Sequence, residues 1–150
     1  MTLLELKQKI KYYTRRAVDG DAALQTLVAI LKNDIPHYTG VYIYMLERDG
    51  QTLKLTHFEG RPTAHTRIPV DQGVCGAAVR EAATVVVPDV AADDRYLACS
   101  AETNSEIVVP IFRDGKVIGE IDIDSDELAP FTEADTEILE FAAATVAERL

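Results

Sequence analysis

The sequence predicts an α+β fold in which one central antiparallel sheet of about six strands carries helices on its faces. Three features lead to this class. Apolar residues recur at helical spacing near both ends of the chain, apolar and polar residues alternate through much of the middle, and Asp-Gly pairs divide alternating segments twice. Because an Asp-Gly hairpin joins neighbouring strands that run in opposite directions, the sheet is expected to be antiparallel.

Helices are expected near both ends of the chain. The first two lie in "LLELKQKIKYYTRRAV" and "DGDAALQTLVAILKNDI", and Asp21 is the expected N-cap of the second. That second helix carries one apolar stripe, formed by Leu24, Leu27, Val28 and Leu31. The last helix lies in "PFTEADTEILEFAAATVAERL", where Thr132 and Asp135 have the spacing of a capping box.

The middle of the chain predicts the sheet. "GVYIYMLE" and "TLKLTHFEG" alternate around Asp49-Gly50 and form one hairpin, and "SEIVVPIFRDGKVIGEIDIDS" forms a second one around Asp114-Gly115. Between them, "TRIPV" and "TVVVPDV" are expected as strands and "GVCGAAVREAA" as a short helix. "AADDRYLACSAETN" is expected to be a loop or short helical segment.

Composition narrows the class of protein. The chain has 150 residues, of which 47% are hydrophobic, as expected for one domain spanning residues 1–150 with its own core. Its formal net charge of −10 argues against nucleic acid and anionic membranes as partners. No signal segment or membrane span is apparent, so a cytoplasmic location with reduced thiols is expected. The two cysteines are far apart and no zinc-binding spacing occurs, so no metal is expected.

Carboxylates on one face of the last strand require an explanation. In "VIGEIDIDS", Glu120, Asp122 and Asp124 point one way, although aspartate is a poor strand former. A solvated face would tolerate them, whereas a pocket would require a cation or a shared proton. A calcium loop beginning at Asp122 would need glycine where Glu127 stands. An organic ammonium group is therefore the better candidate for a bound cation.

Two more chemically important residues are expected close to these carboxylates. Counting outward from the turn between Asp114 and Gly115 places position 106 opposite position 123, which makes Glu106 a neighbour of Asp122 and Asp124. Cys99 lies seven residues before Glu106, in a polar stretch where a thiol could meet solvent and substrate. The same thiol could also be an incidental loop cysteine.

Four blocks of sequence resemble a known family. These are "RIPVDQGVCGAAV", "VVPDV", "ACSAETNSEIVVPI" and "GEIDIDS", and together with the closing helix they resemble GAF domains over roughly residues 20 to 150. Within that superfamily the chain is most similar to the stand-alone free methionine-(R)-sulfoxide reductases. The order and spacing of "AC", "SEIVVPI" and "DIDS" make this resemblance quite specific.

The resemblance implies roles for individual residues. It makes Cys99 the catalytic nucleophile and Cys75 a second cysteine that helps in recycling, although Cys75 also fits a packed core thiol. It implies substrate-binding roles for Glu106, Asp122, Asp124, Tyr42 and, where the family tends to have tryptophan, Tyr38. One departure concerns His65, which stands where the family usually has a third, resolving cysteine and which is expected at the surface.

The implied activity is thiol-dependent reduction of free methionine-(R)-sulfoxide without a cofactor. Cys99 would become a sulfenic acid, and Cys75 or an external thiol, such as thioredoxin or a low-molecular-weight thiol, would complete the cycle. Two alternatives stay open. The chain could be a non-catalytic GAF module that binds a small molecule as a sensor, or an interaction domain that forms a homodimer through its terminal helices.

Overall fold

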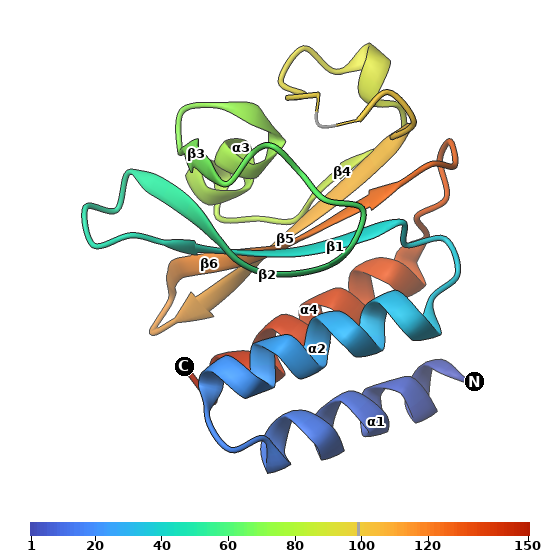
Figure 1. Cartoon of the computed structure of the whole chain (residues 1–150), viewed down its shortest axis with the longest axis vertical. Coiled ribbons are helices and arrows are strands. Elements are labelled where there is room, and N and C mark those ends of the chain that lie inside the picture. The colour runs from blue at the N-terminus through green and yellow to red at the C-terminus, as the bar shows by residue number, and fades with distance from the viewer. Residues whose placement is uncertain (99) are drawn as a thin grey trace.

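A six-stranded antiparallel sheet forms the centre of the molecule (Figure 1). The computed structural model describes residues 1–98 and 100–150. The strand order is β3-β2-β1-β6-β5-β4, so the two long hairpins lie side by side with β1 paired to β6. The strands are β1 (Gly40–Leu46), β2 (Thr52–Gly60), β3 (Arg67–Pro69), β4 (Val85–Val87), β5 (Ser105–Arg113) and β6 (Lys116–Ser125). The predicted α+β class is confirmed.

The helices cover the two faces of the sheet unequally. Three of them lie on one side, with α2 and α4 against the sheet and α1 outside them (Figure 1). The short helix α3 packs on the other side against β5 and β6. The helices are α1 (Leu3–Arg16), α2 (Gly20–Asp34), α3 (Gly73–Glu81) and α4 (Glu133–Ala147), and a 3-10 turn covers Val90–Ala92. Within the described residues, none of the helices is long and apolar enough to cross a membrane.

The helix caps show where local sequence signals succeed and where they fail. The capping box of α4 is present, and the Thr132 backbone N–H donates to Asp135 Oδ2 at 2.8 Å. The predicted N-cap of α2 is wrong by two residues, because Asp19 and not Asp21 accepts a backbone hydrogen bond, from Ala22 at 2.8 Å. Asp21 lies in the first turn, and its carboxylate contacts His57 Nε2 at 2.8 Å instead.

A β-bulge sets the register of the β5–β6 hairpin. At the irregularity, Ile111 pairs with Gly119 and Phe112 with Val117, so Ile118 is an extra residue in β6, and Glu106 lies opposite Asp124 rather than opposite position 123. The expected neighbourhood of these two residues is therefore correct, but the predicted pairing is off by one. Because residues directly opposite each other in a sheet share a face, the bulge places Glu106 and Asp124 on the same side.

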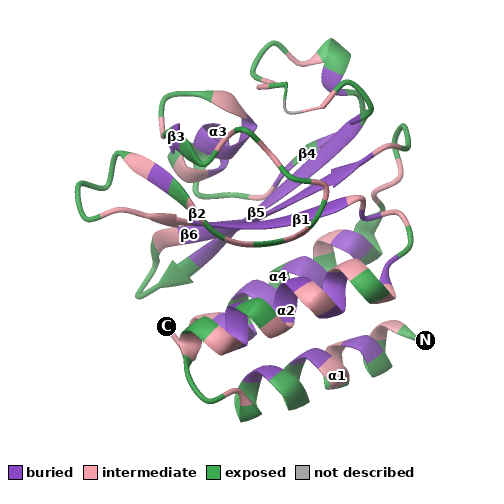
Figure 2. Ribbon diagram, viewed as in Figure 1, coloured by how far each residue is buried: buried purple, intermediate pink, exposed green. Residues whose placement is uncertain are grey.

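The sheet separates two buried clusters (Figure 2). On the helix-covered side, the strands contribute aliphatic residues such as Ile43, Ile107 and Ile121. On the side of α3, the same strands contribute Tyr42, Tyr44 and Val108, which pack with residues of α3 and β4. The candidate site lies on this second side.

Candidate active site

The acidic face of β6 is buried. The exposed fractions of Glu120, Asp122 and Asp124 are 0%, 4% and 3%, and Glu106 of β5 is buried on the same side of the sheet. A solvated face is thereby excluded. Buried carboxylates repel one another and lose their hydration, so this arrangement requires protons, a cation or hydrogen-bond donors to offset the loss.

A thiol lies against this cluster. Cys75 is in the first turn of α3, is buried, and donates a hydrogen bond from Sγ to Asp122 Oδ2 at 3.4 Å. One ligand atom each of Cys75, Glu106 and Asp122 lie within 4.8 Å of one another. Such a set could hold a positively charged group, whether an ammonium or a metal ion. The sequence-predicted residues Cys75, Glu106 and Asp122 are thus brought together.

Burial favours the protonated forms of two carboxyl groups in this cluster. Burial raises the pKa of the Glu120 carboxyl well above its usual value of 4.5, and the neighbouring Asp122 raises it further. Burial also raises the pKa of Asp122, although hydrogen bonds with Glu106 and Cys75 oppose this effect. Burial therefore favours the neutral form of Glu120 in the folded protein, in a place where sequence reasoning assigned no site residue. The signal was available, since Glu120 shares the strand parity of Asp122.

The Cys75 thiol is kept protonated. Its position at a helix N-terminus favours a thiolate, but burial and the adjacent Asp122, Glu120 and Glu106 raise its pKa well above 9.0. Because only a thiolate is a strong nucleophile, Cys75 needs to pass its proton to a base before it reacts. Asp122 is one carboxylate already in hydrogen-bond contact with it.

A small cavity of about 20 Å³ lies over the cluster. Its lining comes from separate parts of the fold, namely Tyr44, His65, Ile68, Gly73, Cys75, Leu97, Glu106 and Asp122. The volume suits roughly one water-sized group. An amino acid can therefore enter only if part of the lining moves. Gly73 allows a close approach here, because its φ is +71° and a Cβ would stand 2.9 Å from Leu97 Cδ1.

His65 is half-buried and belongs to this lining, so its expected place near the surface does not keep it away from the cavity. Its ring Nε2 contacts the Ala98 carbonyl oxygen at 2.9 Å, and its backbone carbonyl accepts a hydrogen bond from the Tyr44 hydroxyl at 2.6 Å. Sequence reasoning missed both Tyr44 and His65 as site residues. For Tyr44 the signal was its shared strand parity with Tyr42. For His65 no local pattern could reveal a contact made across 33 residues.

The two predicted tyrosines lie on opposite sides of the sheet. Tyr42 pairs with Asp122 across β1 and β6 and donates from its hydroxyl to the Arg61 carbonyl at 2.5 Å. Tyr38 packs in the helix-side cluster and donates to Asp135 Oδ1 at 2.8 Å. Burial raises the Tyr38 pKa well above its usual value, so the hydroxyl stays a donor there. The structure does not bring Tyr38 to the carboxylates of the acidic cluster.

Cys99, the predicted nucleophile, lies outside the described residues.

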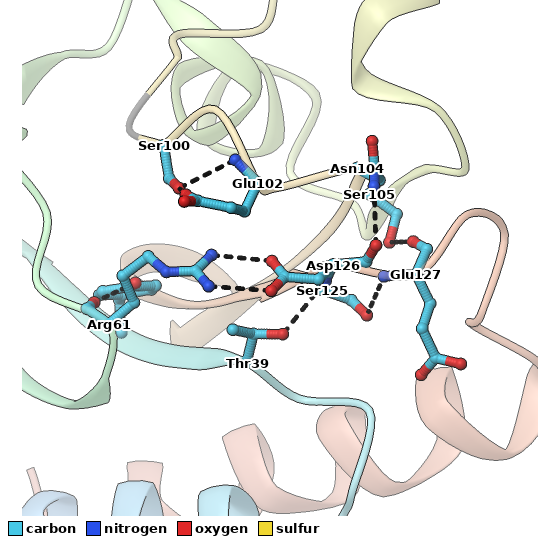
Figure 3. A network of polar contacts seen from close by, with 10 residues as sticks. Thr39, Arg61, Ser100, Glu102, Asn104, Ser105, Ser125, Asp126 and Glu127 are labelled. Atoms are coloured by element: carbon cyan, nitrogen blue, oxygen red, sulfur yellow. Dashed lines mark hydrogen bonds and ion pairs between the residues drawn. The ribbon is translucent and has the colours of Figure 1, made fainter.

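A polar network surrounds Asp126 (Figure 3). Asp126 continues the alternation of Glu120, Asp122 and Asp124, and we call these four residues the acidic row. Arg61 binds Asp126 through two parallel hydrogen bonds of 2.8 Å, and Asn104 Nδ2 donates to the Asp126 carbonyl at 2.7 Å. The Asp126 N–H donates to Thr39 Oγ1 at 3.1 Å. These contacts link the segments that enter β1 and β5 to the residue that follows β6.

Comparisons with known proteins identify relatives of this chain and of its fold. Residues 19–150 match the family profile of the GAF domain. GAF domain-containing protein A of Dictyostelium discoideum is 39% identical over 118 residues, covering 79% of this chain and 73% of the relative. The free methionine-R-sulfoxide reductase of Escherichia coli is 40% identical over 114 residues, covering 76% and 67% respectively. The structure of free methionine-R-sulfoxide reductase from Neisseria meningitidis in complex with its substrate superimposes with a TM-score of 0.92 at 37% identity, covering 98% of this chain and 87% of that one. The chain belongs to the GAF domain family.

Proposed function

We propose that this protein is an enzyme that reduces free methionine-(R)-sulfoxide to methionine, with Cys99 as the nucleophile. The observation that carries the proposal is the buried acidic cluster of Glu106 and Asp122 against the Cys75 thiol. It occurs in a fold that matches a substrate-bound reductase over nearly the whole chain. The reductase from Escherichia coli supports the same assignment.

The acidic cluster suits the ammonium group of a free amino acid. Glu106, Asp122 and Asp124 are buried together, and removing their negative charges from water is unfavourable unless a cation or protons accompany them. A substrate ammonium supplies one positive charge and three N–H donors. A peptide-bonded methionine has no such group, so this cluster would favour the free amino acid.

The proposed chemistry moves one oxygen atom. Cys99 attacks the sulfoxide sulfur as a thiolate while a neutral carboxyl group protonates the oxygen. Overall, Cys99 gains the oxygen and becomes a sulfenic acid, and the sulfoxide is reduced by two electrons to the thioether. Cys75, with Asp122 accepting its proton, then displaces hydroxide from the Cys99 sulfur, so that a disulfide and water form.

An external thiol would return the enzyme to its starting state. Thioredoxin or a low-molecular-weight thiol reduces such a disulfide by exchange. If Cys75 does not react, the same thiol would attack the Cys99 sulfenic acid directly. The proposed location is the cytoplasm, where such reductants keep thiols reduced.

A single-turnover experiment tests the proposal. Reduced protein without added thiol is mixed with the separated R and S forms of free methionine sulfoxide, and methionine is quantified. The expected result is about one methionine per chain from the R form, and none from the S form. Cys99→Ser is expected to abolish the product while leaving the circular dichroism and melting temperature unchanged. Cys75→Ser is expected to have a smaller effect on turnover when external thiol is present.

Two observations favour a second function, a non-catalytic module that binds an amino acid. The histidine at position 65 and the raised pKa of Cys75 both weaken internal recycling of Cys99. In that case neither sulfoxide would yield methionine, yet calorimetry would still detect binding of free methionine or its sulfoxide. Loss of that binding in Asp122→Asn would place the ligand at the acidic cluster.

A further inference from the structure

His65 is held in place by three hydrogen bonds. Its backbone N–H donates to Thr63 Oγ1 at 3.1 Å, and its backbone carbonyl accepts from the Tyr44 hydroxyl at 2.6 Å. The ring reaches across to the Ala98 carbonyl at 2.9 Å. Tyr44 belongs to the central strand β1, so the ring starts from a rigid part of the sheet.

The bond to Ala98 identifies which ring nitrogen carries a proton. A carbonyl oxygen only accepts hydrogen bonds, so Nε2 must carry a hydrogen. That nitrogen keeps its hydrogen in both the neutral tautomer and the imidazolium form. The contact therefore does not require His65 to be charged.

Leu97, next to the far end of this bond, lines the cavity. Tyr96 and Leu97 pack on the cluster that contains Cys75, and Leu97 lies close to Gly73 at the start of α3. We call residues 96–98 the cover segment. Its three residues belong to no helix or strand; side-chain contacts, the His65 bond and a backbone hydrogen bond from the Tyr96 N–H to the Asp93 carbonyl at 3.2 Å help to hold it.

We propose that His65 is a positioning residue that latches the cover segment over the acidic cavity, so that loss of its bond to Ala98 opens the route to Cys75. This inference rests on the proposed function in one respect, which is that the molecule entering the cavity is the substrate. The cavity holds about one water-sized group while the latch is closed. Entry of an amino acid therefore requires the cover segment to move.

Alkylation of Cys75 reports this opening without any turnover. Cys75 is 4% exposed, so iodoacetamide reaches it only when the cover segment or the whole protein opens. Reduced protein is treated in native buffer, and the Cys75 peptide is quantified by mass spectrometry after digestion. A hydrogen bond of ordinary net strength corresponds to about a fivefold change in an opening equilibrium.

Three substitutions at His65 separate the latch from a general structural role. His65→Leu removes the donor, and His65→Asn places its amide nitrogen near the position of Nδ1, too short to reach Ala98. His65→Gln extends an N–H donor to the position of Nε2. We expect Cys75 to be labelled about fivefold faster in the Leu and Asn variants and at the parent rate in the Gln variant. His57→Leu, which removes the contact with Asp21 instead, serves as the matched control and should leave the rate unchanged.

Two results would overturn the latch. One is an unchanged labelling rate in His65→Leu, and the other is a Gln variant that labels as fast as the Leu variant. Labelling is repeated in low concentrations of urea, where a local opening predicts a nearly constant rate and global unfolding a steep rise. A steep rise in His65→Leu would also contradict the proposal. Because no sulfoxide is present, these outcomes are independent of whether the protein reduces methionine sulfoxide.

Discussion

The two faces of β6 are equally buried but chemically opposite. Ile121 and Ile123 point to the helix-covered side and are completely buried there. Glu120, Asp122 and Asp124, which alternate with them, point to the side of α3 and are also almost completely buried. One strand therefore contributes to an apolar core and to an acidic cluster at successive residues.

This difference shows which side stabilises the molecule and which side carries the chemistry. Each isoleucine buried on the helix side contributes roughly 2–3 kcal/mol through the hydrophobic effect. Each carboxyl group buried on the other side lowers stability unless a proton or partner offsets its desolvation. We infer that the helix side supplies the free energy that keeps the acidic side folded.

Ile123→Ala is expected to have the largest effect on stability. It removes aliphatic atoms from a fully buried position and leaves a cavity, which corresponds to a loss of about 3 kcal/mol in the free energy of unfolding. Urea unfolding followed by circular dichroism measures the loss. Val86→Ala, on the exposed side of β4, is the control and should change stability by less than about 0.5 kcal/mol.

The same variant also tests whether the two faces are independent. At a temperature where Ile123→Ala remains folded, methionine yield in a single turnover should match that of the parent. A stability loss below about 1 kcal/mol, or a lost yield in the folded protein, would show that the two faces are not separated as described.

Much of this contrast could be predicted from the sequence. The alternation in "VIGEIDIDS" placed the isoleucines and the carboxylates on opposite faces, and the two Asp-Gly turns gave the antiparallel pairing. Local signals of this kind depend only on strand period and turn chemistry. They also identified the capping box of α4, because both of its residues lie within one turn.

Other features depend on contacts that no local pattern encodes. The bulge at Ile118 has no marker in the sequence, so the register was predicted one residue off. Tyr38 was expected with the substrate-binding residues, but its hydroxyl lies near Asp135, which is 97 residues away. His65 lines the cavity and contacts Ala98, which is 33 residues away in the sequence. Burial of the carboxylates likewise depends on α3, which packs against β5 and β6 from a distant part of the sequence.

Glu120→Gln is expected to have a smaller, pH-dependent effect of opposite sign. Because burial raises the folded-state pKa of Glu120 above its usual 4.5, the folded protein binds a proton that the unfolded chain releases as the pH rises. The parent therefore loses stability above about pH 4.5 until the folded-state pKa is reached. Glutamine has no proton to release, so the variant should gain about 2 kcal/mol over the parent by pH 7.

Unfolding in urea at pH 4, 5.5 and 7 measures this trend. The two proteins should be almost equally stable at pH 4, and the advantage of the variant should grow with pH. Glu127→Gln, at an exposed position, is the control and should show no such trend. If the advantage of Glu120→Gln is constant or falls with pH, Glu120 is ionised in the folded protein and the acidic face is not protonated as inferred.

The smallest effect is expected at the outer end of the same row, for Asp126→Asn. The side chains of Arg61 and Asp126 are 30% and 40% exposed. Their hydrogen bonds lower the pKa of Asp126, whereas burial raises the pKa of Glu120. A depressed pKa means that the pair stabilises the fold above the usual pKa of 3.8, with the contribution lost as the pH falls through the lower folded-state value.

Water and salt screen a pair at this exposure, so a double-mutant cycle with Arg61→Ala should give a coupling of about 0.5 kcal/mol. That coupling should fall further in 1 M salt. A coupling above about 2 kcal/mol that persists in salt would contradict this expectation. It would mean that the low-dielectric environment of Glu120 extends to Asp126. The acidic row would then be desolvated along its whole length, and not buried at one end and solvated at the other.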